Sequence, residues 1–168
     1  NIEDRSILLA PEYITKAKIL NNLKRYDEAF KVLSDNVYKY IKDGKSENFH
    51  ILLARTLVEI ARAENGLKRY DSALSYIQDS IAILTRDNDN LASSKNIHLA
   101  NALFIRGEIL FNKNYCDKAI KNYKTSIIYT KNSSYSYEEF YKICYEQGKR
   151  MKAFSKKSKK CLILCNNN

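Results

Sequence analysis

The sequence has very few of the residues that interrupt helices. Its 168 residues include 4 Gly and 1 Pro, and Trp is absent. A turn-rich β protein needs more Gly and Pro, whereas the abundant Leu, Ile, Ala, Lys and Glu favour an all-helical chain. The length suits one domain with a sizeable core. The first residue is Asn1 rather than Met, so we expect a fragment or a processed chain.

Several functional signatures are also missing. No apolar run approaches the roughly 18 residues that cross a bilayer, and no signal peptide opens the chain. The 4 Cys and 2 His residues show no zinc-ligand spacing, so we expect reduced thiols and a cytoplasmic protein. There is no Gly-rich phosphate loop, and neither His50 nor His98 accompanies a nucleophile pattern. These absences predict a non-enzymatic protein without a cofactor or a bound metal.

Negative charge is scarce near the end of the chain. The formal net charge is +10, and eight Lys or Arg residues from Lys142 onward face Glu146 alone. The basic run Lys149–Lys160 has two interpretations: a capping helix with a polar outer face, which we favour, or a weak contact with nucleic acid or an anionic membrane.

One stretch of the sequence is repeated. Leu67–Leu74 and Leu23–Phe30 are identical at six of eight positions and lie 44 residues apart. Weaker copies follow at Asn114–Ile120 and Gly148–Phe154. Self-similarity at a fixed period indicates an array of stacked structural repeats.

Apolar spacing divides the chain into helix pairs. We expect a single domain over 10–165, a lead-in or the end of an upstream helix over 1–9, and a disordered tail over 166–168. The predicted pairs are 10–44, 46–88, 91–132 and 135–165, eight helices in all.

Local signals refine the expected helices. The first helix has a predicted apolar stripe of Tyr13, Ala17, Leu20 and Leu23. Asp27 and Asp71 are expected to cap the second helices of their pairs. Gly66 is expected to end a helix, and Gly107, inside one, indicates close contact with a neighbouring helix.

Three positions of each repeat resemble the tetratricopeptide repeat (TPR) pattern. A small residue lies twelve positions before the repeated Ala, an aromatic three before it and a large residue four after it. In order of repeat, the small residues are Ala17, Ala61 and Gly107, the aromatics are Tyr26 and Tyr70, and the large residues are Leu33, Ile77 and Tyr123. The pattern weakens at Cys116, which takes the third aromatic position, and in the fourth repeat, and no Pro closes any repeat.

The resemblance implies a right-handed α-solenoid of about four helix pairs. Repeats of 44–46 residues resemble the regulatory domains of peptide-sensing bacterial regulators and also the kinesin light chain. The bias towards Asn, Lys, Ile and Tyr is consistent with an AT-rich genome, which favours the bacterial regulators. Chaperone-binding TPR domains carry a Lys/Asn clamp that this sequence lacks, so chaperone tails are not expected ligands.

In such an array the first helices of the pairs line a concave groove. Asn side chains both donate and accept hydrogen bonds, and Arg55 and Arg62 share one face that suits a carboxylate. The alternative is that these are ordinary solvated polar residues. The predicted groove residues are Lys18, Asn21, Asn22, Arg55, Glu59, Arg62, Asn65, Asn101, Phe104, Glu108 and Phe111, with Ile14, Val58, Ile105, Glu138, Lys142 and Tyr145 beside them.

The sequence therefore predicts a protein- or peptide-binding module, which we interpret as the sensor part of a larger regulator. A DNA-binding part would then lie upstream of the chain. Whether the protein forms a homodimer is an open alternative. The alternative is a structural scaffold that self-associates or stacks on a partner through its terminal repeats.

Overall fold

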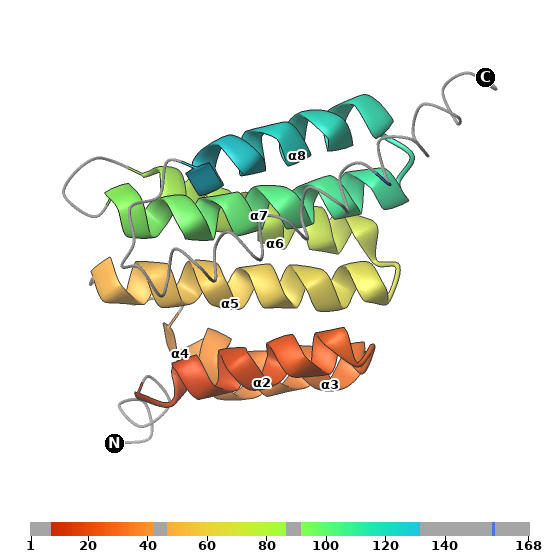
Figure 1. Cartoon of the computed structure of the whole chain (residues 1–168). Coiled ribbons are helices and arrows are strands. Elements are labelled where there is room, and N and C mark those ends of the chain that lie inside the picture. The colour runs from red at the N-terminus through yellow and green to blue at the C-terminus, as the bar shows by residue number, and fades with distance from the viewer. Residues whose placement is uncertain (1–7, 42–46, 87–91, 132–155, 157–168) are drawn as a thin grey trace. The chain divides into compact units, whose positions relative to one another are not determined.

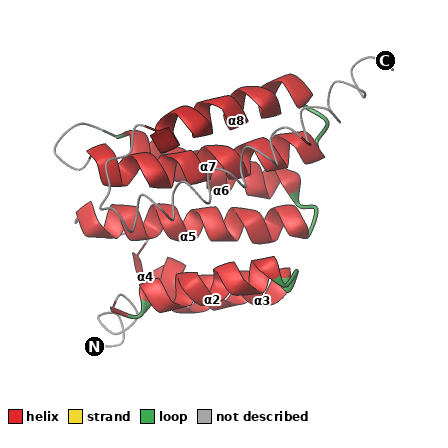
Figure 2. Cartoon of the chain, viewed as in Figure 1, coloured by secondary structure: helices red, strands yellow, loops and turns green. Residues whose placement is uncertain are grey.

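A computed structural model describes residues 8–41, 47–86, 92–131 and Lys156. Helices and short connections make up all of this described part of the chain (Figure 2). Contacts divide the chain into two compact units, Asn1–Arg86 and Asp87–Asn168. The predicted single domain over 10–165 stays a prediction.

Three helix pairs occupy the places that the repeats predicted (Figure 1). The first pair is α2 (Ala10–Asn22) with a second helix made of α3 (Tyr26–Leu33), η1 (Ser34–Tyr38) and α4 (Lys39–Ile41). The second pair is α5 (Glu47–Gly66) and α6 (Tyr70–Thr85), and the third is α7 (Ala92–Asn112) and α8 (Cys116–Lys131). The predicted fourth pair over 135–165 lies outside the described residues. None of the described helices is long and apolar enough to cross a membrane.

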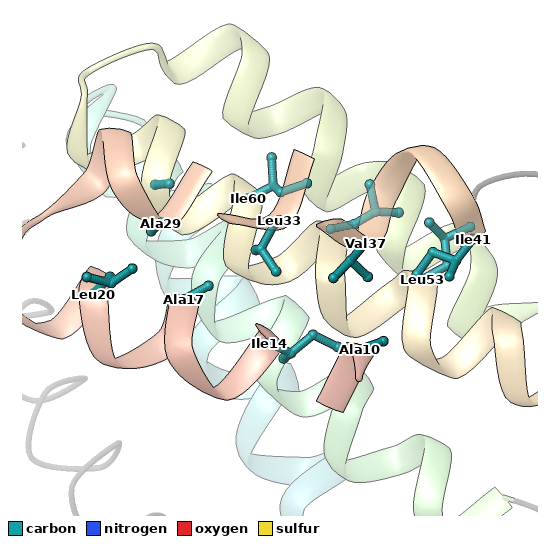
Figure 3. Packing of buried hydrophobic residues seen from close by; sticks show 12 residues of the cluster. Ala10, Ile14, Ala17, Leu20, Ala29, Leu33, Val37, Ile41, Leu53 and Ile60 are labelled. Carbon is teal, nitrogen blue, oxygen red and sulfur yellow. The ribbon is translucent and has the colours of Figure 1, made fainter. Parts of the chain in front are cut away.

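The core of the first unit lies between α2, α3 and α5. Leu33 and Ile41 from the second helix pack with Leu53 and Ile60 of α5 in one cluster (Figure 3). The labelled residues of α2 in Figure 3, from Ala10 to Leu20, point into the same cluster. The predicted stripe is correct at Ala17 and Leu20 and wrong at Leu23, which follows the end of α2 at Asn22 and is 61% exposed.

The second helix of the first pair contains a π-helical turn, η1. Its buried residues Ala29, Leu33, Val37 and Ile41 lie four positions apart. Four residues exceed one α-helical turn of 3.6, so such a run would drift around a regular helix. The wider π-turn absorbs the difference and keeps Val37 and Ile41 fully buried.

Each of the three helix pairs buries the small and the large residue of the repeat pattern. Ala17 and Leu33 are buried in the first pair, and Ala61 and Ile77 in the second. The third pair has the most extreme sizes, because Gly107 lies under the ring of Tyr123. A Cβ added at Gly107 would come within 2.5 Å of that ring, which confirms the close helix contact that Gly107 predicted. Gly66 likewise ends α5, as predicted, and lies against the ring of Tyr26.

One side-chain hydrogen bond recurs between the helices of a pair. The buried hydroxyl of Ser80 in α6 donates to the carbonyl oxygen of Ala54 in α5 at 2.9 Å. Ser126 in α8 donates to Ala100 in α7 in the same way, at 2.5 Å. In the first pair the residue 44 positions before Ser80 is Asn36, and its amide donates to the Val32 carbonyl oxygen of its own helix instead, at 3.0 Å.

The turns inside the three pairs share one backbone form. Lys24, Lys68 and Asn114 adopt positive φ angles of 62°, 63° and 64°. After α2, the Arg25 amide donates to the Leu20 carbonyl at 2.9 Å and the Lys24 amide to that of Asn21 at 3.1 Å. These bonds form a Schellman motif, which satisfies the last carbonyls of a helix. The same bonds follow α5 and α7.

The expected capping by Asp27 and Asp71 is wrong. Arg25 and Arg69 precede α3 and α6, and neither helix has a side-chain cap. The left-handed residue turns the chain so sharply that each helix starts one residue before its Asp. Both carboxylates therefore lie in the first turn, where they complement the helix dipole.

Replacing Lys68 by Gly is expected to raise the free energy of unfolding by about 1 kcal/mol, because Gly adopts a positive φ without a Cβ penalty. Urea denaturation measures the change. Lys68→Ala is the matched control, since it removes the same charge but keeps the Cβ. Equal stability of the two variants would contradict the assigned strain.

Candidate functional site

Four of the predicted groove residues form a polar cluster between α2 and α5. Asn21 and Asn22 end α2, and Glu59 and Arg62 lie on the last turns of α5. The Asn21 amide donates to the Glu59 carbonyl oxygen at 2.9 Å and to Oε2 of its carboxylate at 3.0 Å. We call Asn21, Asn22, Glu59 and Arg62 the α2–α5 cluster.

Glu59 is the centre of this cluster. Its side chain is 5% exposed, and a buried carboxylate is costly unless it is paired and hydrogen-bonded. Arg62 supplies the positive charge, with Nη1 3.1 Å from Oε2. The second guanidinium nitrogen of Arg62 donates to Oδ1 of Asn22 at 2.8 Å. The cluster therefore connects the first helices of two successive pairs by polar bonds.

The amide oxygen of Asn21 lies in an unusual position. The residue is 5% exposed, and its Oδ1 is buried without a hydrogen-bond partner in the described part of the chain. Its nitrogen faces two oxygens of Glu59, so reversing the amide would set oxygen against oxygen. The orientation of the amide is thereby fixed. Buried polar atoms nearly always have a partner, so this acceptor is a candidate for a ligand.

The remaining predicted groove residues of the first unit do not join the cluster. Lys18 is exposed and Arg55 half-buried, and neither has a hydrogen bond or ion pair within the described residues. Asn65 is half-buried and has a contact of its own. Arg55 and Arg62 share one face but lie seven residues apart, about 10 Å along the helix, and Arg62 already binds Glu59. The suggested pair of arginines around one carboxylate is therefore not preformed.

Three apolar residues that were expected beside the groove lie in the core instead. Ile14 is 4% exposed, Val58 3% and Ile105 6%. The expected position on the groove wall was therefore wrong for these three. Helical spacing placed them near the boundary between the inner face and the groove, and burial of apolar area decides such a position.

Two of the predicted residues of the second unit, Glu108 and Phe104, contact Tyr123 of α8. The hydroxyl of Tyr123 donates to Oε1 of Glu108 at 2.7 Å, and the Phe104 and Tyr123 ring centroids are 5.4 Å apart. Asn101 and Phe111 are half-buried and also have contacts.

Arg106 is a polar residue that the sequence argument missed. Its Nε donates to Oδ1 of Asn122 at 2.6 Å, and burial lowers the pKa of its guanidinium. Arg106 and Asn122 were not singled out because they lie on different helices, 16 residues apart.

Metal and thiol chemistry has little support in the described ranges. Within them, no group of three or more His, Cys, Asp or Glu side chains could hold a metal ion. Cys116 is a buried free thiol. The predicted groove positions Glu138, Lys142 and Tyr145, and most of the basic run Lys149–Lys160, lie outside the described residues.

Among the comparisons with known proteins, the comparison of folds gives a match and the two sequence comparisons do not. No protein-family model matches the sequence, and no curated protein matches it either. The solved structure of a TPR-like protein from Chlorobium tepidum superposes with a TM-score of 0.69. The match covers 95% of this chain and 98% of that one, at 13% sequence identity. The chain has a TPR-like, all-helical fold. At this identity the likeness concerns the fold alone.

Arg62→Ala is expected to lower the free energy of unfolding by about 2 kcal/mol, because it leaves the Glu59 carboxylate buried without its cation. Chemical denaturation of the full chain measures the loss.

Arg25→Ala is the matched control for this prediction. Arg25 also pairs with a Glu three positions away, at 2.6 Å, but both side chains are 55% exposed. The Arg25 guanidinium lowers the pKa of Glu28, yet solvent screens the pair, so stability should not change measurably. Equal losses in the two variants would contradict the central place of Glu59.

Proposed function

We propose that the chain is a non-enzymatic module that binds an extended peptide segment on the first-helix face of its first unit. The observation that carries the proposal is the buried, unpartnered Oδ1 of Asn21. An extended peptide presents backbone N–H groups that suit such an acceptor. The TPR-like fold supports the proposal, since stacked helical repeats present long binding surfaces.

Access to Asn21 requires a small local movement. Its Oδ1 is covered, so a ligand N–H reaches it only after a neighbouring side chain moves aside. Asn22 and Lys18 are exposed and lie within one turn of Asn21. Exposed side chains change rotamer in picoseconds to nanoseconds.

The charges near the α2–α5 cluster favour an acidic ligand. Arg62 and Glu59 neutralise each other, which leaves Lys18 and Arg55 as cations without a described partner. A carboxylate on the peptide would pair with Lys18 while the backbone meets Asn21. In this proposal Glu59 and Arg62 hold the cluster in shape, and Lys18, Asn21 and Asn22 meet the ligand.

The finer assignments rest on the resemblance of the repeats. We propose a cytoplasmic sensor of short acidic peptides within a larger regulator. Asn65, Asn101, Phe104, Glu108 and Phe111 stay predicted contact residues. The alternative is a scaffold that stacks through its terminal repeats. It is favoured by a separate observation, the exposed apolar side chains of Ile19 and Leu23 beside the turn between α2 and α3.

Lys18→Ala and Asn22→Ala are each expected to weaken peptide binding about tenfold, because each removes one hydrogen bond to the ligand, and that of Lys18 is charge-assisted. Ligands are selected from a random peptide library on the full chain and then measured by isothermal titration calorimetry. Lys31→Ala on α3 is the control, because it removes the same charge from another exposed site. Selected peptides that bind all variants alike, or a library without any binder tighter than about 1 mM, would refute the proposal.

A further inference from the structure

The side of α2 that faces away from the core has a row of exposed apolar residues, with the exposed Glu12 and Lys16 beside it. Leu8 just before the helix is 75% exposed, Ile19 is 54% exposed and Leu23 just after it 61%. With Pro11 and Thr15 they follow a row of steps of three and four residues, which places them on one side. We call these five residues the α2 outer face. Single exposed apolar residues are ordinary, but an aligned row indicates a contact surface.

This face is shaped as well as apolar. A shallow open groove of about 500 Å³ runs along it, and its lining residues are Pro11, Glu12, Thr15, Lys16, Ile19, Leu20, Leu23 and Arg25. The Ala10, Ile14 and Ala17 side chains point to the opposite side, into the cluster of Figure 3. The groove and the core therefore lie on different sides of α2 and meet at Leu20, which contributes to both.

The second helix pair reveals how such a face is used. Forty-four residues on, α5 carries Ile60 and Ala63 at the positions of Lys16 and Ile19, and both are buried, at 1% and 0% exposure. They belong to the cluster that α3, the second helix of the preceding pair, covers. The same side of α5 is thus occupied by an amphipathic helix, and no described residue occupies that side of α2.

We propose that the α2 outer face binds one amphipathic α-helix of a partner protein, in the way that α3 lies on α5. Ridges of i, i+4 side chains on such a helix pack into a groove of this kind. The proposal concerns a different row of α2 side chains from Lys18 and Asn21, and the two surfaces border each other at Asn22.

Differences between α2 and α5 specify the chemistry of the partner. Lys16 stands where α5 has Ile60, so the partner helix needs a carboxylate opposite its ammonium group and no acidic residue opposite Glu12, which lines the same groove. Asn22 stands where α5 has Gly66, over which the Tyr26 ring lies, so the partner has a small residue there. The fitting helix has an aliphatic ridge, an acidic flank and no aromatic residue at its start.

A second copy of the chain is a weaker candidate for this occupant. The 13 residues of α2 span about 20 Å, and two such faces bury less than the roughly 1,200 Å² of a stable symmetric interface. One helix lying in a groove needs no such area for micromolar binding.

The test uses the full chain and a helical probe taken from its own sequence. The probe is a fluorescent peptide of residues 27–41, which has the ridge Phe30, Leu33, Val37 and Ile41, an acidic start and no Tyr26. A lactam between Lys31 and Asp35, both exposed in the structure, keeps it helical, because short free helices are unstable. Fluorescence anisotropy measures its binding.

We expect saturable binding with a Kd on the order of 100 µM, weakened about tenfold by Ile19→Asp and by Leu23→Asp. Both side chains are more than half exposed, so circular dichroism should show intact folds. Ile128→Asp is the matched control, since Ile128 on α8 is 57% exposed and lies off this face. Lys18→Ala should also bind the probe normally, which separates this proposal from the peptide site.

Three outcomes would overturn the inference. The first is that the wild-type chain does not bind the probe, and the second is that Ile19→Asp binds it as well as wild type. The third is a concentration-dependent dimer in sedimentation that Ile19→Asp abolishes, which would make a second copy the occupant.

Discussion

The buried carboxylate of Glu59 constrains the arrangement of the first unit. Placed between the ends of α2 and α5, it has to be neutralised by Arg62 and hydrogen-bonded by Asn21. These bonds fix the amide of Asn21, and the fixed amide leaves its oxygen as a buried acceptor. The candidate ligand contact is thus a consequence of how the two helices are connected. A Gln at position 59 would remove the charge and with it the reason for Arg62 to lie here.

The helix pairs could be predicted because several local signals agree. Repeated Ala positions, apolar spacing and the small residue before each repeat all placed the same helices, and Gly107 predicted the contact that Tyr123 makes. The turns were predicted less well, because a left-handed Lys leaves no mark in the sequence as clear as Gly would. The Asp caps therefore failed, and Leu23 was assigned to the core although it follows the end of α2.

The candidate site was predicted as a set of residues but not as a set of bonds. Spacing brought Asn21, Glu59 and Arg62 to neighbouring positions of the repeat, yet it cannot distinguish a polar side chain that awaits a ligand from one that binds its neighbour. That choice depends on burial, which separates Arg62 from the exposed Lys18 although both hold the same repeat position. For the same reason Ile14 and Val58 were expected on the groove wall, although both are buried in the core.

The side-chain amide signals of Asn21 and Asn22 in a nitrogen–proton correlation spectrum test the central claim most directly. Titration with a selected acidic peptide should shift both signals, because a ligand N–H then reaches Oδ1 of Asn21. Asn36 on the second helix, whose amide donates to Val32 at 3.0 Å, should stay unchanged as the internal control. Saturation of binding with the Asn21 signals unmoved would contradict the account.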